Sequence, residues 1–303
     1  MNFELCENQF LKLSFSESET LTVQDFYDRF IPSKKIQHLC IQNGWITLDG
    51  KKVKRETGLQ GKELIINLYP EKQNYPKLEN DEVRIVYEDP FVIVAFKPAG
   101  IIVHDDGNNS ETLLGKVRSH YSEMPYTINQ IQRLDRETSG LILFTKSPVF
   151  EPWLNLQLEE RSIHRKYLAI SRGKAEPGKT FTIKKDISRD RHDSRKMIVS
   201  KNGQKASTFV EVLASDGKYS AFRCTLQTGR THQIRVHLSS NGYPILNDEL
   251  YGIRSDLCTN MALCAYRLEF YQPFDDKQIK LEITPPKDID RLIKKIKKAS
   301  LTD

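Results

Sequence analysis

The chain has 303 residues, of which 38% are hydrophobic and 28% charged, a balance typical of a folded protein with one or two domains. No apolar run approaches the ~20 residues that cross a bilayer, and the acidic start lacks the basic region of a secretory signal, so neither a membrane protein nor a secreted one is expected. The five cysteines are scattered without a C-x-x-C pair, which favours reduced thiols in the cytoplasm and argues against a zinc site.

Positive charge gathers in two segments, although the formal net charge of the chain is only +6. Residues 29–62 hold eight lysine or arginine residues against two acidic ones, and residues 184–205 hold eight against three. Such segregated charge suits a surface that binds a polyanion, because each neutralised phosphate releases counterions. Two solvated loops with ordinary lysines would give the same pattern.

The segment 1–72 predicts a small N-terminal α/β module. Ser33 is a favourable helix N-cap, and the helix that follows is expected to end at Gly44. Residues 45–53 predict a hairpin around an Asp-Gly turn, and residues 64–68 predict a strand. The pattern resembles the small RNA-binding domain of a small-subunit ribosomal protein, which implies RNA contacts on its basic helix and hairpin. A module that only orients the rest of the chain is the alternative.

Residues 73–82 are polar, include a proline and predict a linker to the main domain, residues 83–303. Strands are expected there at 83–87, 92–96, 141–144, 167–170, 209–213 and 219–226, and helices at 113–121, 152–160 and 231–240. Strands outnumber helices without a regular βαβ alternation, so the expected fold class is α+β with a mixed, largely antiparallel sheet. Apolar residues spaced i, i+3, i+4, i+7 over 289–296 predict a terminal amphipathic helix packed on this domain rather than an RNA-gripping tail.

Asp135 stands in a polar run directly before the apolar strand expected at 141–144. A carboxylate half-buried at such an edge stays ionised only beside a cation or hydrogen-bond donors. Arg230, Thr231 and Arg235 are candidate partners, and a helix starting here would place the first two in its first turn. Taken alone, the R-L-D-R sequence fits a structural ion pair or a turn as well as a catalytic site.

Five short segments with chemically informative residues occur in one order along the chain. They are K-P-A-G-I-I-V-H at 97–104, R-L-D-R-E-T-S-G at 133–140, R-K-Y-L-A at 165–169, T-G-R-T-H-Q-I-R-V-H at 228–237, and P-I-L-N-D at 244–248 with Y-G at 251–252. This order resembles the RluA-type pseudouridine synthase family over roughly residues 83–286. The resemblance implies an antiparallel-rich α+β domain with a central cleft on one sheet face, and an enzyme that isomerises uridine in RNA.

The resemblance also implies roles for individual residues. Asp135 matches the catalytic aspartate of the family, and Arg235 matches the arginine that pairs with it. Tyr167 matches the tyrosine that lies against the uracil and is proposed as a base. Arg133 matches the arginine thought to enter the RNA stack as the target nucleotide flips out.

The predicted RNA contacts lie at the cleft, on the N-terminal helix and in a third place, the basic segment 186–205, which is expected to be a mobile RNA-gripping loop. All are basic residues: Arg133, Arg136, Arg230, Lys34, Lys35, Arg189, Arg191, Arg195 and Lys196.

The implied reaction breaks the glycosidic N–C bond, turns the uracil and rejoins it through carbon. It involves no redox change and no phosphate transfer, so no cofactor and no metal are predicted, and the sequence has no P-loop, G-x-G-x-x-G or Cys/His cluster. One carboxylate can attack the sugar or take a proton from it. An ordinary glycosidase needs two carboxylates across the bond, and Glu137, the one nearby acid, is poorly placed to pair with Asp135.

The chain departs from the family pattern outside the Asp, Tyr and Arg trio, which indicates a divergent branch. Residues other than the common histidine or glycine stand at four positions, namely Gln132, Cys264, Gln272 and Asn247. His104, His232 and His237 are expected to be hydrogen-bonding scaffold rather than general bases, and Lys97 is expected to begin a structural turn under the cleft.

Three functions of different class remain open on the sequence. The favoured one is a cytoplasmic pseudouridine synthase, most simply a monomer, that acts on structured RNA: large-subunit ribosomal RNA, with transfer RNA as the alternative substrate. The second is a non-catalytic RNA-binding or ribosome-assembly factor with the same fold. The third, a base deaminase, is disfavoured because H-x-E and C-x-x-C motifs are absent.

Overall fold

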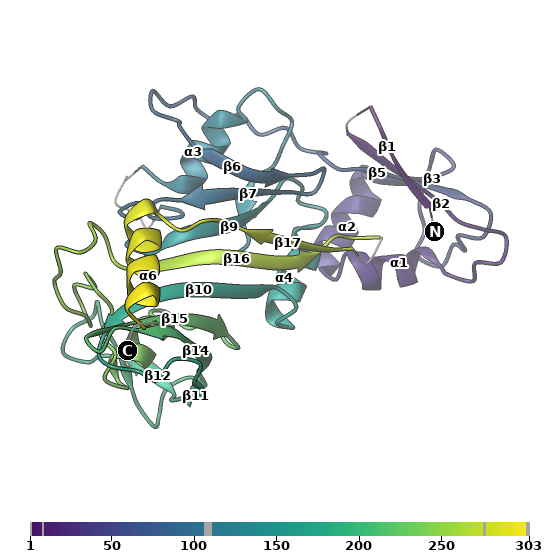
Figure 1. Cartoon of the computed structure of the whole chain (residues 1–303). Coiled ribbons are helices and arrows are strands. Elements are labelled where there is room, and N and C mark those ends of the chain that lie inside the picture. The colour runs from purple at the N-terminus through teal and green to yellow at the C-terminus, as the bar shows by residue number, and fades with distance from the viewer. Residues whose placement is uncertain (1, 8, 106–110, 275–276, 301–303) are drawn as a thin grey trace.

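A computed structural model describes residues 2–7, 9–105, 111–274 and 277–300, which form a small N-terminal unit and a larger unit around a long sheet (Figure 1). The strands divide into a five-stranded sheet, a ten-stranded sheet and a two-stranded hairpin. Within these described residues, none of the helices combines the length and apolar character that a membrane span requires.

The N-terminal unit packs two helices against the five-stranded sheet. Its elements are β1 (Asn2–Cys6), β2 (Phe10–Ser14), α1 (Val23–Phe30), α2 (Lys34–Asn43), β3 (Ile46–Leu48), β4 (Lys51–Lys52) and β5 (Glu63–Asn67), with the strand order β1-β2-β5-β3-β4. The predicted helix is confirmed as α2: the Ser33 hydroxyl accepts a hydrogen bond from the backbone N–H of Ile36, and Gly44 ends the helix in the left-handed conformation. The predicted hairpin and third strand are confirmed as β3–β4 and β5, whereas β1, β2 and α1 were not predicted.

The ten-stranded sheet forms the body of the molecule and confirms the α+β, largely antiparallel fold class. Its strands are β6 (Arg84–Glu88), β7 (Val92–Lys97), β8 (Asn129–Gln130), β9 (Ser139–Thr145), β10 (His164–Arg172), β11 (Thr180–Lys184), β14 (Ser207–Ser215), β15 (Tyr219–Leu226), β16 (Leu263–Tyr271) and β17 (Gln278–Glu282). The main order is β11-β14-β15-β10-β16-β9-β7-β6, with β17 beside β16 and β8 beside β9. β16 pairs with β9 in parallel, and the other paired strands of the described sheet are antiparallel.

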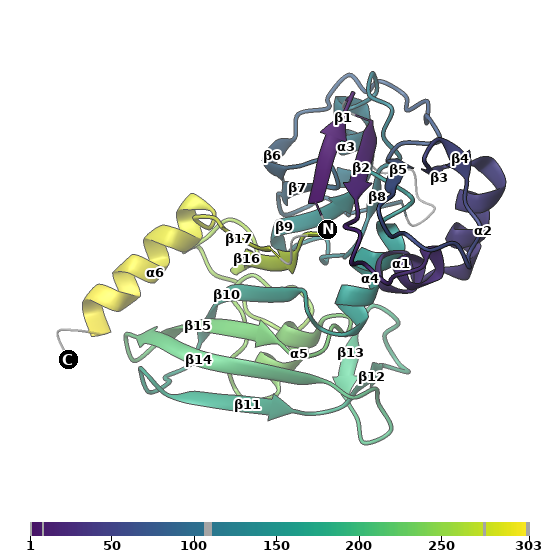
Figure 2. The same ribbon diagram turned by 90° about the vertical axis from the view of Figure 1, so that its right-hand side faces the viewer.

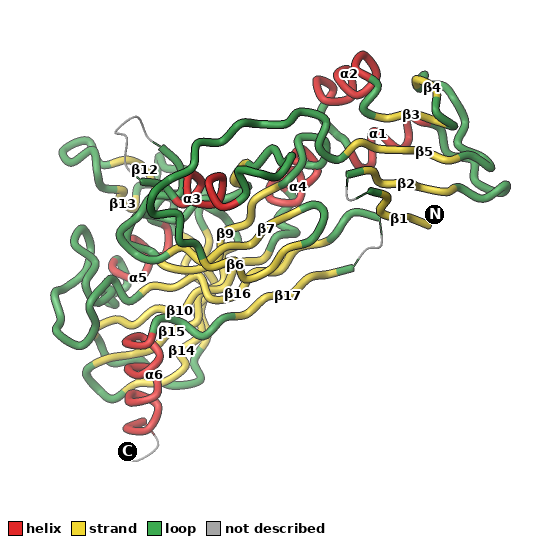
Figure 3. The backbone as a smooth tube through the Cα atoms, turned by 90° about the horizontal axis from the view of Figure 1, so that it is seen from above, coloured by secondary structure: helices red, strands yellow, loops and turns green. Residues whose placement is uncertain are grey.

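Four helices accompany this sheet: α3 (Leu113–His120), α4 (Glu151–Glu159), α5 (Gln233–Ser239) and α6 (Lys287–Ser300). The predicted terminal helix is confirmed as α6, whose buried apolar side chains include Ile289 and Ile296. Tyr167 of β10 shares a pocket with residues of α5, whereas the next residue, Leu168, shares one with residues of α6. Successive strand residues point to opposite faces, so α5 and α6 cover opposite faces of the sheet, as seen edge-on in Figure 3.

An aromatic cluster joins the N-terminal unit to the larger one. The ring of Phe274, between β16 and β17, lies 4.7 Å from the Phe30 ring of α1 and 5.4 Å from the Phe150 ring. The Tyr69 hydroxyl also donates to the Pro90 carbonyl at 2.7 Å. Figure 2 shows α1 beside α4 at this junction. Between β5 and β6 the chain has no helix or strand, and the linker boundary at 73–82 stays a prediction.

Two local predictions were wrong. The basic segment 186–205 is not a loop without regular structure, because β12 (Ile187–Arg189) and β13 (Met197–Val199) pair in it as an antiparallel hairpin. The helix expected from residue 231 begins as α5 at Gln233, so Arg230 and Thr231 precede it rather than form its first turn. The cause of the second error is His232, which caps α5 in the left-handed conformation at φ +55°.

Candidate active site

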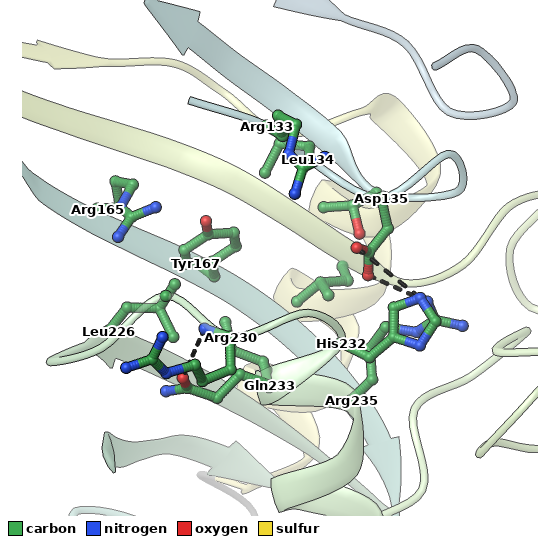
Figure 4. Close-up of a pocket in the computed structure, with 14 residues that line it drawn as sticks. Arg133, Leu134, Asp135, Arg165, Tyr167, Leu226, Arg230, His232, Gln233 and Arg235 are labelled. Carbon is green, nitrogen blue, oxygen red and sulfur yellow. Dashed lines mark hydrogen bonds and ion pairs between the residues drawn. The ribbon is translucent and has the colours of Figure 1, made fainter. Parts of the chain in front are cut away.

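A pocket lies on the α5 face of the ten-stranded sheet, where the loop before β9 meets β10 and the loop before α5 (Figure 4). It holds about 440 Å³ of open space. The predicted residues Asp135, Tyr167 and Arg235 all line it, although they are far apart in the sequence. A larger cleft adjoins this pocket, and Arg133 and Asp135 line both.

Asp135 reaches the pocket from a loop that buried hydrogen bonds hold in place. Lys97, at the end of β7, is fully buried, and its ammonium group donates to the carbonyls of Pro98, Ile101 and Arg136 at 2.7–2.8 Å. Burial lowers the pKa of Lys97 to about 8. The backbone N–H of Gly100 also donates to the Arg136 carbonyl, at 2.9 Å. The residue after Asp135 is therefore fixed to the turn that follows β7.

Arg235 holds the Asp135 carboxylate from the first turn of α5. Its Nη1 donates to Asp135 Oδ2 at 3.0 Å, which confirms the predicted pairing. The Arg235 side chain is 5% exposed and that of Asp135 is 25% exposed. The carboxylate is thus anchored at one oxygen and still open to the pocket. A charge-assisted contact of this kind is shorter and stronger than a hydrogen bond between neutral groups.

Asp248 fixes Arg235 in turn, by a contact that the sequence did not assign. Its two carboxylate oxygens accept from Nε and Nη2 of Arg235, both at 2.8 Å, and its side chain is 0% exposed. The same carboxylate accepts the backbone N–H groups of Leu250 and Tyr251. Burial by itself lowers the pKa of Arg235, but the hydrogen bonds and charges of Asp248 and Asp135 outweigh it and raise that pKa. Arg235 is therefore a permanent cation clamped between two carboxylates.

His232 approaches Asp135 from its other side. Its Nε2 lies 3.9 Å from Asp135 Oδ1, and its Nδ1 lies 2.7 Å from the Tyr251 hydroxyl. That hydroxyl accepts the backbone N–H of Met197, in β13, at 2.6 Å, so its own proton is free to point at Nδ1. The arrangement favours the tautomer whose Nε2–H faces Asp135. Burial, with the charge of Arg235, lowers the pKa of His232, which keeps the ring neutral near pH 7.

Tyr167 forms part of the pocket wall from β10. Its side chain is 5% exposed, and burial raises the pKa of its hydroxyl. The resting side chain is therefore a protonated phenol, which is suited to packing against a ring and to hydrogen bonding.

The predicted RNA-binding residues separate into three groups. Arg133 and Arg230 are exposed and line the pocket, while Arg136 is exposed and donates to the Gly100 carbonyl at 2.9 Å. Of the hairpin residues, Arg189 lines the adjoining cleft. Arg191 and Arg195 are exposed on the hairpin, and Lys196 is half-buried there. The third group, Lys34 and Lys35, is exposed at the start of α2 in the N-terminal unit. The structure therefore brings the hairpin, but not the α2 lysines, to the rim of the site.

The sequence assigned no role to Asp248, which contacts Arg235, or to Tyr251, which contacts His232, although both stand in the ordered segments. The hydrogen bond of His232 to Tyr251 fits the scaffold role expected of it, but its approach to Asp135 was not predicted. Gln132, one of the departures from the family pattern, is buried and lines the adjoining cleft. Among the described residues, no group of three or more His, Cys, Asp or Glu side chains could hold a metal ion.

Comparison with known proteins agrees with this geometry. The family model for RNA pseudouridylate synthase matches residues 91–240. An uncharacterized RNA pseudouridine synthase of Bacillus subtilis, YhcT, is 36% identical over 264 residues, covering 85% of this chain and 83% of that protein. The ribosomal large subunit pseudouridine synthase D of Neisseria meningitidis serogroup A is 35% identical over 274 residues, covering 84% of this chain and 72% of that protein.

A solved structure supports the same assignment. The human RNA pseudouridylate synthase domain containing 1 superposes with a TM-score of 0.58 at 25% identity, covering 70% of this chain and 87% of that one. The fold and the pocket are thus those of an RNA-modifying isomerase. The chain belongs to the RluA-type RNA pseudouridine synthase family, as its ordered motifs predicted.

Proposed function

We propose that this enzyme isomerises specific uridines of large-subunit ribosomal RNA to pseudouridine, with Asp135 as the catalytic carboxylate. The position of Asp135 is the observation that carries the proposal. Of the described residues that line the pocket, Asp135 is the one with a carboxylate, and Arg235 Nη1 lies 3.0 Å from its Oδ2. A lone, oriented carboxylate suits a reaction that needs one acid at the sugar, whereas hydrolysis of a glycosidic bond would need two.

In this proposal, the residues around Asp135 have separate roles. Arg235 fixes one oxygen of Asp135, so the other oxygen is left to act on the sugar, by attack or by taking a proton. Tyr167 packs against the uracil that has left the stack. Arg133, exposed at the pocket, takes the place that the nucleotide vacates in the RNA. These contacts offset the few kcal/mol that unstacking costs.

The ribosomal substrate rests on the relatives. The Neisseria protein named above is a ribosomal large subunit pseudouridine synthase, and 84% of this chain aligns with it. The exposed basic side chains of the N-terminal unit and of the hairpin fit a large structured RNA, since each can neutralise a phosphate. Transfer RNA is the alternative substrate.

A map of pseudouridines in cellular RNA, made by carbodiimide modification, tests both parts of the proposal. The host strain is compared with a strain lacking the gene and with that strain carrying either the wild-type gene or Asp135→Ala. We expect specific sites in large-subunit ribosomal RNA to disappear and to return only with the wild-type gene. Sites lost from transfer RNA instead would overturn the substrate assignment, and sites restored by Asp135→Ala would overturn the role of Asp135.

A further inference from the structure

Arg165 occupies the passage between the pocket and the adjoining cleft. It lies on β10 two residues before Tyr167, so both side chains are on the α5 face of the sheet. Arg165 lines both the pocket and the cleft, together with Arg133, Asp135 and Arg230. Figure 4 shows its guanidinium group beside the Tyr167 ring, apart from the contact between Asp135 and Arg235.

The guanidinium group of Arg165 has no partner in the part of the chain that the structure describes. It forms no hydrogen bond or ion pair there, and its Nε is buried without an acceptor. Its far end lies against the backbone of Gly229, where an added Cβ would stand 3.1 Å from Nη2. Arg223, on the other face of the sheet, also has a buried Nε without an acceptor, but its Nη1 is paired with Glu211 at 2.8 Å.

A guanidinium group without a partner favours the binding of an anion beside it. A guanidinium group stays protonated in proteins, and withdrawing it from water without a partner is unfavourable. Asp135, the carboxylate of the same pocket, is already held by Arg235. The anion that an RNA substrate brings is the phosphodiester, and its oxygens match the planar N–H fork of arginine.

We propose that Arg165 binds the phosphodiester adjacent to the target uridine and so holds the sugar of that nucleotide over Asp135. The position fits, because Arg165 and Arg133 line both the pocket that holds Tyr167 and the adjoining cleft, so a backbone that runs from one to the other passes beside them. The inference rests on the proposed function for the placement of the base, and it adds the binding site for the charged backbone.

The test uses an RNA oligonucleotide that carries the uridine found by the cellular map, whether ribosomal or transfer. The phosphodiester on its 5′ or its 3′ side is replaced, one at a time, by an uncharged methylphosphonate. In the wild-type enzyme one of the two replacements is expected to lower kcat/KM by about 10- to 100-fold, the value of one charge-assisted contact. Arg165→Gln is expected to lower kcat/KM for the native RNA by a similar factor.

The decisive result is the combination of the two changes. With Arg165→Gln, the sensitive neutral linkage should lower kcat/KM by no more than about twofold further, because the contact is already lost. Arg223→Gln, the matched control at a paired arginine, should keep the full response to that linkage. Losses that multiply at both linkages would overturn the proposal and favour a guanidinium stacked on a base.

A second variant covers the case in which Arg165→Gln is poorly folded. Gly229→Ala keeps every charge but places a methyl group against the Arg165 guanidinium, so it should lower kcat/KM and weaken the response to the same neutral linkage. An unchanged response would contradict the proposed contact. A wrong assignment of Asp135 would be seen separately, as an Asp135→Ala enzyme that still converts the oligonucleotide.

Discussion

The pocket and the β12–β13 hairpin both contain arginines, but they hold them in opposite ways. Arg235 is 5% exposed and is bonded to two carboxylates, one of them fully buried. Arg195 is 74% exposed and is paired with Asp193, two residues earlier in the same turn. The buried arginine cannot move without leaving charges unpaired, whereas the exposed one is free to change partners. The arginine of the pocket is therefore fixed in position, whereas that of the hairpin can exchange Asp193 for a phosphate, as the proposed RNA binding requires.

The largest effect expected from this difference concerns Asp248. Asp248→Asn removes a buried negative charge from Arg235, and breaking a buried pair at one partner lowers the free energy of unfolding by about 3–5 kcal/mol. Urea denaturation monitored by circular dichroism measures the change. Asp193→Asn, the same substitution in the exposed pair, should leave the transition midpoint unchanged. Equal shifts of the transition midpoint in the two variants would contradict the difference proposed between the pocket and the hairpin.

Tyr251→Phe tests the link between the regions, because the Tyr251 hydroxyl joins Met197 of the hairpin to His232 beside Asp135. Loss of two hydrogen bonds of about 1 kcal/mol each should lower kcat by up to about 30-fold while KM changes little. Steady-state kinetics on the mapped RNA measures both. Tyr243→Phe, at a ring that packs on Phe222 away from the pocket, is the control and should be neutral. A change in KM alone would show that Tyr251 serves RNA binding and not Asp135.

The hairpin arginines should give the smallest effect on catalysis. Replacing Arg189, Arg191 and Arg195 together by glutamine should weaken RNA binding and reduce the slope of log K against log salt by about 2–3, one unit or slightly less for each lost phosphate contact. The value of kcat at saturating RNA should stay within about twofold of wild type. Fluorescence anisotropy at several salt concentrations measures the slope.

A matched control for the hairpin lies on the other face of the sheet. Three of the exposed lysines of α6, at positions 294, 295 and 298, can be changed to glutamine in one variant, which removes the same charge from the side away from the pocket. This variant should keep a nearly unchanged salt slope. Equal slopes for the two triple variants would mean that the hairpin makes no RNA contact of its own.

Local signals account for the elements that the sequence predicted. Ser33 and Gly44 marked both ends of α2, and the spacing of Ile289 and Ile296 with their apolar neighbours marked α6. The same kind of signal was present but unused at α1, where Thr22 and Asp25 form a capping box. β16 was missed for a different reason: besides the adjacent β17 it pairs with β9 and β10 from distant parts of the chain, and no short window contains those contacts.

Only the contacts of the site that the ordered motifs imply could be predicted from the sequence. They placed Asp135 and Arg235 together across 100 residues of sequence, and the structure confirms that contact. They did not assign Asp248 or Tyr251, because those contacts require the segment after α5 to fold back under Arg235. They also did not place His232, whose left-handed backbone turns its ring toward Asp135 and starts α5 later than the pattern indicated.

The single-turnover rate of purified Asp135→Asn on the mapped RNA, measured beside its RNA affinity, tests the central claim most directly. The substitution keeps the shape of the side chain and removes its charge. We expect the dissociation constant to stay within about threefold of wild type, while the rate of pseudouridine formation falls by about 10⁴-fold or more. A rate within tenfold of wild type at unchanged affinity would contradict the account, since a side chain other than Asp135 would then be acting on the uridine.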